Sequence, residues 1–116
     1  CDWSSDVCSS DLVAAARLAE VTRTLWSAGD PGVTLANASV YLEAFGHVVV
    51  SWIWLEQALV AQAALAGATG EDADFYRGKL AATAYFFRFE LPKVYPQLDL
   101  LASLDRTTLD MQDAWF

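Results

Sequence analysis

One histidine and a few carboxylates are the side chains in this sequence whose chemistry could serve a catalytic site. His47 is the single histidine among 116 residues, and it follows Phe45 and Gly46 in an apolar stretch. A histidine base needs an orienting partner and a nucleophile close by, and the surrounding sequence offers neither. We therefore expect a packing or hydrogen-bonding role for His47.

Glu56 interrupts the same apolar stretch, and a carboxylate in such a place could act as an acid inside a pocket. The structural alternative is an ion pair with Lys79 or Arg88 across two helices, or a side chain that extends to solvent, and we favour it. Glu43 and Glu90 match no catalytic motif. We accordingly predict no catalytic, cofactor-binding or metal-binding residue in this chain.

The first twelve residues, CDWSSDVCSSDL, differ in composition from the rest of the chain. They contain both cysteines, Cys1 and Cys8, and repeat a Ser-Ser-Asp unit, whereas alanine-rich sequence begins at Val13. The string resembles the read-through translation of a common sequencing adapter. We predict that residues 1–12 are a non-native segment and that residues 13–116 form the genuine domain. The cysteine spacing then indicates neither a redox compartment nor a metal site.

Composition argues against several kinds of partner. The formal charge is −8, and the seven Lys and Arg residues are scattered along the chain. Neither nucleic acid nor an anionic membrane surface is therefore an expected ligand. The hydrophobic fraction of 55%, with five Trp and six Phe, is enough for a core and leaves apolar surface for a protein partner.

The most apolar stretch, residues 44–68, is long enough to cross a bilayer, which takes about 20 residues. Polar residues interrupt it, so we expect a buried core helix and no membrane span. The first twelve residues also lack the basic start and the apolar centre of a signal peptide. We expect a cytoplasmic protein.

Periodic apolar residues predict three helical stretches. The first covers about residues 12–28, with one apolar stripe at helical spacing: Leu18, Val21, Leu25 and the neighbouring Trp26. This helix should end at Gly29-Asp30-Pro31-Gly32, because glycine suits a left-handed cap and proline cannot continue a helix.

The second predicted helix begins between Thr34 and Ser39 and runs to about Ala66, where Gly67 stops it. It carries a heptad seam of residues at alternating steps of three and four: Leu42, Phe45, Val49, Trp52, Glu56, Leu59 and Ala63. At about 1.5 Å per residue the helix would be roughly 40–50 Å long. Helices of this length pack side by side in bundles, so we expect the seam to face a neighbouring helix.

The third predicted helix begins near Glu71 and Asp72, whose charges suit a helix N-terminus. A matching seam follows, at Tyr76, Leu80, Thr83, Phe87, Glu90, Val94 and Leu101. Pro92 lacks an amide hydrogen and should kink or break the helix, and Pro96 could start a new turn of a short apolar helix.

Residues 107–116 are predicted to form a loop that Trp115 and Phe116 close by docking on the bundle. No stretch shows the alternation of a strand. The expected fold class is therefore all-α, an up-and-down bundle of three to four helices with two long antiparallel helices.

Six aromatic residues lie on the second and third predicted helices: Trp52, Trp54, Tyr85, Phe86, Phe87 and Phe89. They could line a ligand cavity, although an aromatic stripe at helical spacing is more often core. Phe86, Phe87 and Phe89 point to different sides of one helix. Part of the cluster is therefore expected to cover a partner domain or a second subunit.

Three segments, in this order, resemble one known region. They are NASVYLEAFGHVVVSWIWLEQALVA at residues 37–61, DFYRGKLAATAYFFRFELPKV at 74–94 and TTLDMQDAWF at 107–116. The region is the C-terminal, acetyl-CoA dehydrogenase-like domain of the large acyl-CoA dehydrogenases. The most distinctive pieces are the run FYRGKLA at 75–81 and the Glu-Leu-Pro turn at 90–92.

The resemblance implies a parent enzyme that binds FAD and oxidises an acyl-CoA thioester at its α,β carbons. In that family a glutamate removes the α proton, the β hydride goes to the flavin, and an electron-transferring flavoprotein accepts the electrons. In that family the glutamate base, the flavin contacts and the thioester site belong to the core domains, and this chain does not resemble those domains. The resemblance thus implies a non-catalytic accessory fragment, without FAD contacts, that packs on the core domains of its own chain or helps to assemble a homo-oligomer.

A second class of function stays open. The chain could be a free-standing acidic helical interaction module without enzymatic activity, in which case its gene would begin near Val13. A membrane-associated helical hairpin is a third reading.

Overall fold

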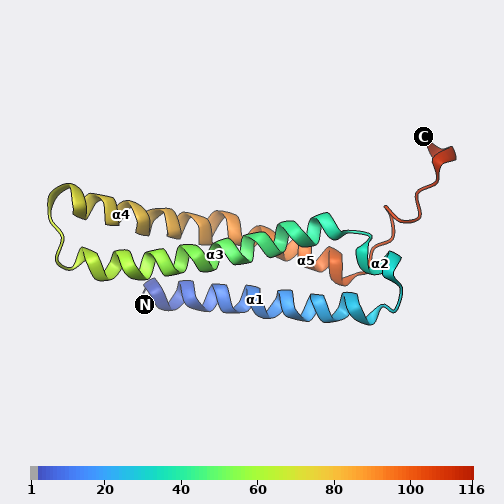
Figure 1. Ribbon diagram of the computed structural model, residues 1–116, viewed down its shortest axis with the longest axis horizontal. Helices are drawn as coiled ribbons and strands as arrows, with labels where there is room; N and C mark the ends of the chain where they lie inside the picture. Colours follow the sequence, from blue (N-terminus) through green and yellow to red (C-terminus); the bar gives the residue numbers. More distant parts are fainter. Residues whose placement is uncertain (1–2) are drawn as a thin grey trace.

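The computed structural model describes the backbone of residues 3–116 and the side chains of residues 6–116, and Figure 1 shows its helices side by side along one long axis. The five α-helices are α1 (Trp3–Ser27), α2 (Pro31–Leu35), α3 (Ala38–Leu65), α4 (Gly70–Tyr85) and α5 (Val94–Ala102). Three short turns complete the list: the π-helical η1 (Phe86–Glu90) and the 3-10 turns η2 (Leu91–Lys93) and η3 (Asp113–Trp115). No strand occurs within residues 3–116, so the predicted all-α bundle is confirmed.

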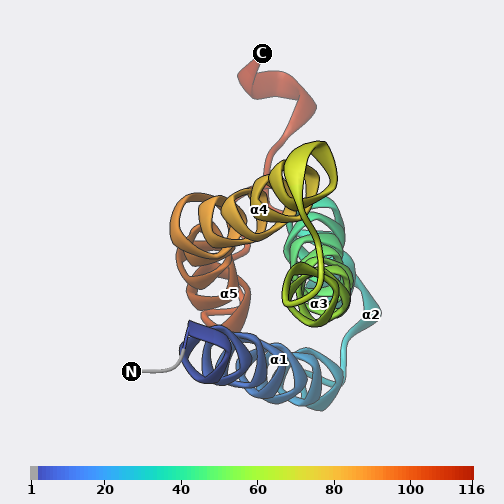
Figure 2. The ribbon, with the colours of Figure 1, turned by 90° about the vertical axis from the view of Figure 1, so that its left-hand side faces the viewer.

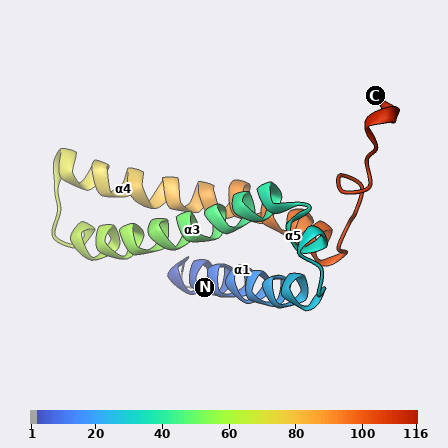
Figure 3. The ribbon, with the colours of Figure 1, turned by 45° about the vertical axis from the view of Figure 1, so that its right-hand side comes forward.

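The long helices surround one interior. Figure 2 looks along the bundle and shows α1, α3, α4 and α5 arranged around it, with α3 and α4 forming an antiparallel hairpin. The molecule is elongated, with extents of 65 × 29 × 20 Å. The tip of the hairpin extends well past the N-terminal end of α1 (Figure 3), so the bundle thins to two helices there.

The first break lies where glycine and proline predict it. Gly29 has a φ of 72°, in the left-handed region that favours glycine. The Asp30 side chain accepts a hydrogen bond from the Gly32 amide at 2.9 Å and caps α2, while Pro31 occupies the first turn, where its missing N–H costs nothing.

The start of α1 differs from the predicted one. Periodicity placed it near Leu12, whereas the helix extends back to Trp3. Val7 is 8% exposed and joins the core, and the Ser51 hydroxyl lies 2.6 Å from the Asp11 carboxylate. The Ser-Asp string lacks glycine and proline, so it can continue a helix that the following alanines favour.

The division into residues 1–12 and 13–116 stays a prediction. Cys1 lies outside the described residues. Cys8 is a free thiol, partly buried against the core, and among the described residues it has no disulfide partner.

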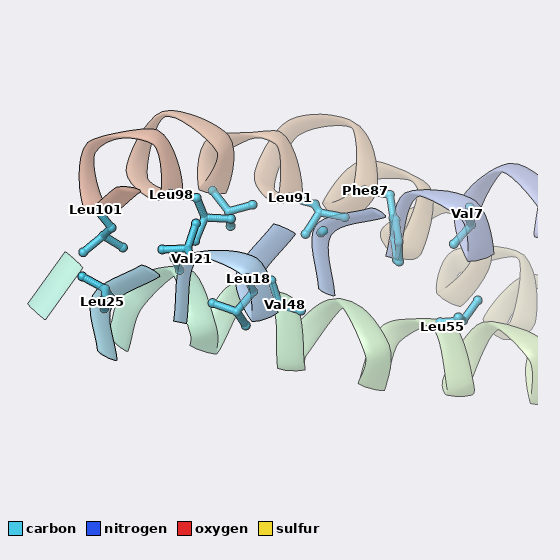
Figure 4. Packing of buried hydrophobic residues seen from close by; sticks show 13 residues of the cluster. Val7, Leu18, Val21, Leu25, Val48, Leu55, Phe87, Leu91, Leu98 and Leu101 are labelled. Carbon is cyan, nitrogen blue, oxygen red and sulfur yellow. The ribbon is translucent and has the colours of Figure 1, made fainter. Parts of the chain in front are cut away.

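The core lies where α1, α3 and α5 meet. Figure 4 shows Leu18, Val21 and Leu25 of α1 opposite Leu98 and Leu101 of α5. Val21 and Leu98 are both 0% exposed. The predicted apolar stripe of the first helix is therefore confirmed for Leu18, Val21 and Leu25, whereas Trp26 is 75% exposed and its predicted burial was wrong.

Polar contacts fix α1 against its neighbours. Arg17 Nη2 donates to Asp99 Oδ1 of α5 at 2.9 Å, and the hydroxyls of Thr22 and Tyr41 lie 2.8 Å apart between α1 and α3. The hydrogen bond that Arg17 donates to Asp99 raises the pKa of Arg17 above its ordinary value. These contacts connect residues far apart in the sequence and set the order in which the helices pack.

The junction between α4 and α5 is irregular, as Pro92 predicts, but the irregularity begins earlier, at Phe86. The predicted seam placed Glu90 inside; the structure buries Leu91 at 2% exposure and leaves Glu90 partly exposed. A π-helical turn takes more residues than an α-helical one, so the inward position moves one residue along the chain. The other seam residues of the third predicted helix are buried or half-buried.

The predicted seam of α3 faces outward, and that expectation was wrong. Leu42, Phe45 and Trp52 are 70%, 44% and 55% exposed. The buried residues of α3 are Ala44, Val48, Ser51, Leu55, Ala58 and Ala61. Five of them, from Ala44 to Ala58, follow the same alternation of three and four, and their mostly small side chains allow neighbouring helices to approach closely.

The C-terminal tail does not close on the bundle, so this prediction was also wrong. Trp115 and Phe116 are 66% and 93% exposed, and the tail leaves the helices in Figure 1. The start of the tail is held, because the Thr108 hydroxyl donates to the Ala36 carbonyl at 3.0 Å. Nothing apolar receives the last two aromatic rings.

Candidate functional site

His47, Glu90 and Lys93 meet where the α4–α5 junction crosses α3. His47 Nε2 lies 3.4 Å from Glu90 Oε2, and Nδ1 lies 3.2 Å from the Glu43 carbonyl oxygen. Lys93 Nζ donates to both carboxylate oxygens of Glu90 at 3.1 Å. The imidazole also stacks on Phe86, with ring centres 5.9 Å apart. The expected hydrogen-bonding role of His47 agrees with this geometry.

The carboxylate of Glu90 is held in its charged form. The hydrogen bond from Lys93, followed by that from His47, lowers the pKa of Glu90 below its ordinary value of 4.5. A carboxylate stabilised in this way is a weak base, and among the described side chains, residues 6–116, His47 makes no hydrogen bond to a hydroxyl or thiol. The cluster is suited to bracing the irregular junction against α3 rather than to catalysis.

Glu56 lies beside a groove between α3 and α4 near the hairpin tip. The groove has a volume of about 320 Å³ and is lined by Glu56, Gln57, Val60, Ala61, Phe75, Tyr76 and Lys79. Lys79 Nζ lies 5.4 Å from the ring centre of Phe75 and 5.9 Å from that of Trp54. Within residues 3–116 no ion pair joins Glu56 to Lys79 or Arg88, so the predicted pairing was wrong. Aromatic faces attract the ammonium instead, and the exposed Glu56 side chain matches the solvent-extended alternative.

The aromatic cluster divides between the core and the surface. Phe87 is buried at 9% exposure, whereas Trp52, Tyr85 and Phe89 are each 55% exposed. Tyr85 and Phe89 stack on each other with ring centres 4.7 Å apart. The three neighbouring phenylalanines therefore do not share one interior, as predicted from their spacing.

One helix carries a long exposed apolar surface, which we call the outer face of α3. It comprises seven side chains that are 36% to 70% exposed: Leu42, Phe45, Val49, Trp52, Ile53, Leu59 and Val60. By length and composition α3 could also cross a membrane, with a mean hydropathy of 1.5 in a window that is 28% buried. One such helix is weak evidence, because a core helix of a soluble protein passes the same test. The helix α3, which was expected to be a buried core helix, is buried on one face only. Its other face is apolar and exposed.

The described part of the chain does not contain a cluster of metal-ligating side chains. Across residues 3–116 no group of three or more His, Cys, Asp or Glu side chains could hold a metal ion.

These features define a small helical-bundle domain. It has a charged brace, formed by His47, Glu90 and Lys93, at the irregular junction between α4 and α5, and a long apolar face on α3. A family model described as "Acetyl-CoA dehydrogenase C-terminal like" matches residues 12–112. The chain belongs to this family, the C-terminal domain of acyl-CoA dehydrogenases.

Two curated relatives carry the same region. The broad-specificity linear acyl-CoA dehydrogenase of Mycobacterium tuberculosis is 35% identical over 77 residues, which cover 66% of this chain and 13% of that protein. The butyryl-CoA dehydrogenase of Syntrophomonas wolfei is 30% identical over 97 residues, which cover 82% of this chain and 16% of that protein. The chain therefore spans a small part of the length of the relatives that it matches.

FAD, which the family implies, does not fit the residues described here. A dinucleotide needs backbone amides that cradle its phosphates, usually in a glycine-rich loop that opens a helix. Gly67 precedes α4 and Gly70 is its first residue, and the two glycines do not have the G-x-G-x-x-G spacing of a dinucleotide loop. The groove beside Lys79 is apolar, and that ammonium already faces two aromatic rings. Among the described residues, neither these glycines nor this groove suits the phosphates of FAD.

Proposed function

We propose that this chain is the non-catalytic C-terminal accessory domain of an FAD-dependent acyl-CoA dehydrogenase. The parent would oxidise an acyl-CoA thioester at its α,β carbons, with FAD held by its core domains and an electron-transferring flavoprotein as acceptor. Support comes from the family match over residues 12–112 and from relatives named for linear acyl-CoA and butyryl-CoA substrates. A cytoplasmic location is part of the proposal.

The outer face of α3 carries the proposed role in packing. Seven large apolar side chains on one helix face exceed the scattered apolar residues that a self-sufficient surface tolerates. Covering such a face with another protein surface is favourable, because it removes apolar side chains from water. The domain would use it to pack against the core domains of its own chain or to assemble a homo-oligomer.

The purified chain, incubated with FAD and butyryl-CoA, provides the direct test. We expect no flavin absorbance after gel filtration and no reduction of an electron-acceptor dye, because the described residues offer no flavin cradle. Retained flavin or acyl-CoA oxidation by this chain would contradict a non-catalytic role.

The free-standing interaction module is the second candidate, and the exposed aromatic side chains favour it to the same degree. The gene sequence upstream of the Val13 codon separates the two. An in-frame dehydrogenase core upstream supports the accessory domain. A start codon near Val13 with no such core supports the free-standing module.

A further inference from the structure

We propose that the residues directly upstream of Val13 in the parent protein continue α1 as a helix. They would fill the part of the bundle where Val7 and Asp11 lie here. This helix would carry an aliphatic side chain six positions before Val13 and a small or apolar one two positions before it. The proposal rests on the accessory-domain function proposed above and on the prediction that residues 1–12 are non-native.

The inward-facing seam of α1 crosses residue 13 without a change of register. Its members are spaced alternately by four and three residues: Val7, Asp11, Ala14, Leu18, Val21 and Leu25. Val7 and Ala14 are both buried, so one continuous face of the helix lies inside. The family match begins at residue 12, within this helix. The packed helix therefore extends upstream of the sequence that the family shares.

The surface that receives Val7 belongs to the matched region, and we call it the Val7 site. Val7 lines a crevice with Ala84 at the end of α4 and with Phe87 of η1, and Figure 4 shows it close to Phe87. Leu55 of α3 belongs to the same buried cluster. Phe87 and Leu55 are each only 9% exposed. A chain without an apolar side chain in this site would return part of that surface to water, which is unfavourable.

The position of Asp11 accepts a small or apolar residue. The Ser51 hydroxyl is fully buried and lies 2.6 Å from the Asp11 carboxylate and 2.6 Å from the Val48 carbonyl of its own helix. A hydroxyl has one proton to donate, so the carbonyl satisfies Ser51 when no carboxylate is near. A half-buried aspartate in an apolar seam also loses hydration. The packing thus needs no acid at this position.

Covalent continuity selects the segment that fills the Val7 site. The residues before Val13 are attached to a helix that already leads to the site, so their effective concentration there is high. Extending a formed helix adds hydrogen bonds without a new nucleation step. The distance from Val13 to the site is about 9 Å, six residues at about 1.5 Å each. Another segment could enter only if the chain turned away at Val13, and the alanines at 14–16 strongly favour helix there.

The gene sequence upstream of the Val13 codon gives the first test. We expect no glycine or proline in the eight codons before Val13, with the aliphatic and the small or apolar residue at the stated positions. An in-frame dehydrogenase core whose last residues lack this pattern would overturn the helical continuation and leave the accessory function standing. A genome that encodes residues 1–12 themselves would also overturn it. The absence of any core upstream would instead overturn the accessory function.

Urea unfolding of the 116-residue chain tests the Val7 site itself. Val7→Ala should move the unfolding midpoint to a lower urea concentration, because it removes buried methyl groups. The matched control is Leu12→Ala, an aliphatic residue of the same segment that is 69% exposed, and we expect its midpoint to stay unchanged. Equal midpoints in Val7→Ala and the unsubstituted chain would overturn the site.

A hybrid chain tests the occupant. In it, the twelve residues that the gene encodes before Val13 replace residues 1–12. We expect an unfolding midpoint at least as high as that of the 116-residue chain. Alanine in place of the aliphatic residue six positions before Val13 should then lower the midpoint as Val7→Ala does. A hybrid with a lower midpoint than the 116-residue chain would contradict the proposal.

Hydrogen exchange at residues 13–16 of the hybrid measures the helix directly. The first four N–H groups of an α-helix have no helical acceptor. These amides therefore exchange rapidly if the helix begins at Val13 and slowly if it begins upstream. The amides of residues 20–23 are the control, because they lie inside α1 in either case. Rapid exchange at 13–16 alone would overturn the continuation, whereas flavin retention or acyl-CoA oxidation would overturn the accessory role and leave this pattern intact.

Discussion

At the scale of single residues, the charged brace around Glu90 is the feature that sequence reasoning located least well. His47 was expected to form a hydrogen bond, but its partner lies 43 positions away in the chain, at Glu90. A lone histidine carries no information about such a partner. Glu90 lies at the end of the π-helical turn Phe86–Glu90 and meets His47 only across the contact with α3.

Glu90 makes stability depend on acid pH. The pKa of Glu90 is lower in the folded protein than the ordinary 4.5. Glu90 therefore makes its full contribution to the free energy of unfolding above about that pH. The contribution is lost as the pH falls through the lowered pKa of the folded state, because the unfolded chain then binds the proton more readily. We expect the free energy of unfolding to decline below pH 4.5, and Glu90→Gln to remove part of that decline.

Urea titrations at a series of pH values measure this effect. Glu43→Gln is the control, because Glu43 contributes its main-chain carbonyl to His47 and the substitution retains that group. An unchanged acid slope in Glu90→Gln would show that the brace does not stabilise the fold.

At the scale of elements, the passage from α4 to α5 shows how far local rules reach. Pro92 correctly indicates a break, because proline cannot donate the backbone hydrogen bond. Which residue then faces inward depends on the π-helical turn at Phe86–Glu90, whose formation the local sequence did not reveal. The buried residue is Leu91, one position after the Glu90 of the ideal repeat.

Leu91→Ala tests this register. Leu91 is 2% exposed, so the substitution should lower the free energy of unfolding by about 2–5 kcal/mol. Leu100→Ala is the same change at a residue that is 41% exposed, and we expect about 1 kcal/mol or less. Comparable losses in both variants, measured by urea denaturation, would contradict the one-residue shift.

At the scale of the whole molecule, the bundle is thick at one end and thin at the other. The large side chains with less than 2% exposure include Val21, Leu98 and Leu101, all near the end where α5 joins α1 and α3. Near the hairpin tip the buried apolar residues of α3 and α4 are alanines: Ala58, Ala61 and Ala73. Two helices joined through alanines bury little area, so this arm should open more easily than the core.

Native-state hydrogen exchange measures that difference. We expect the amides of residues 59–65 and 74–80 to exchange through local opening, well before those of residues 44–55, whose protection should approach the global value. Equal protection along the whole of α3 would show that the arm and the core unfold as one unit.

The sequence by itself determined the helices and most of their ends. These depend on local properties: the conformational freedom of Gly29, the missing amide of Pro92 and the helical period of the apolar residues. Most of the stripe of α1 was equally predictable, because Leu18, Val21 and Leu25 recur at steps of three and four. The family resemblance could likewise be stated from order and spacing alone.

Only the tertiary structure decided which seam of α3 lies inside. Both faces of this helix are apolar and both repeat every 3.5 residues, so periodicity could not choose between them. The bundle takes the face of Ala44, Ser51 and Ala58, because small side chains let the other helices come close on several sides at once. The bulky face with Phe45 and Trp52 stays outside, where the size that excludes it from its own core suits it to a partner.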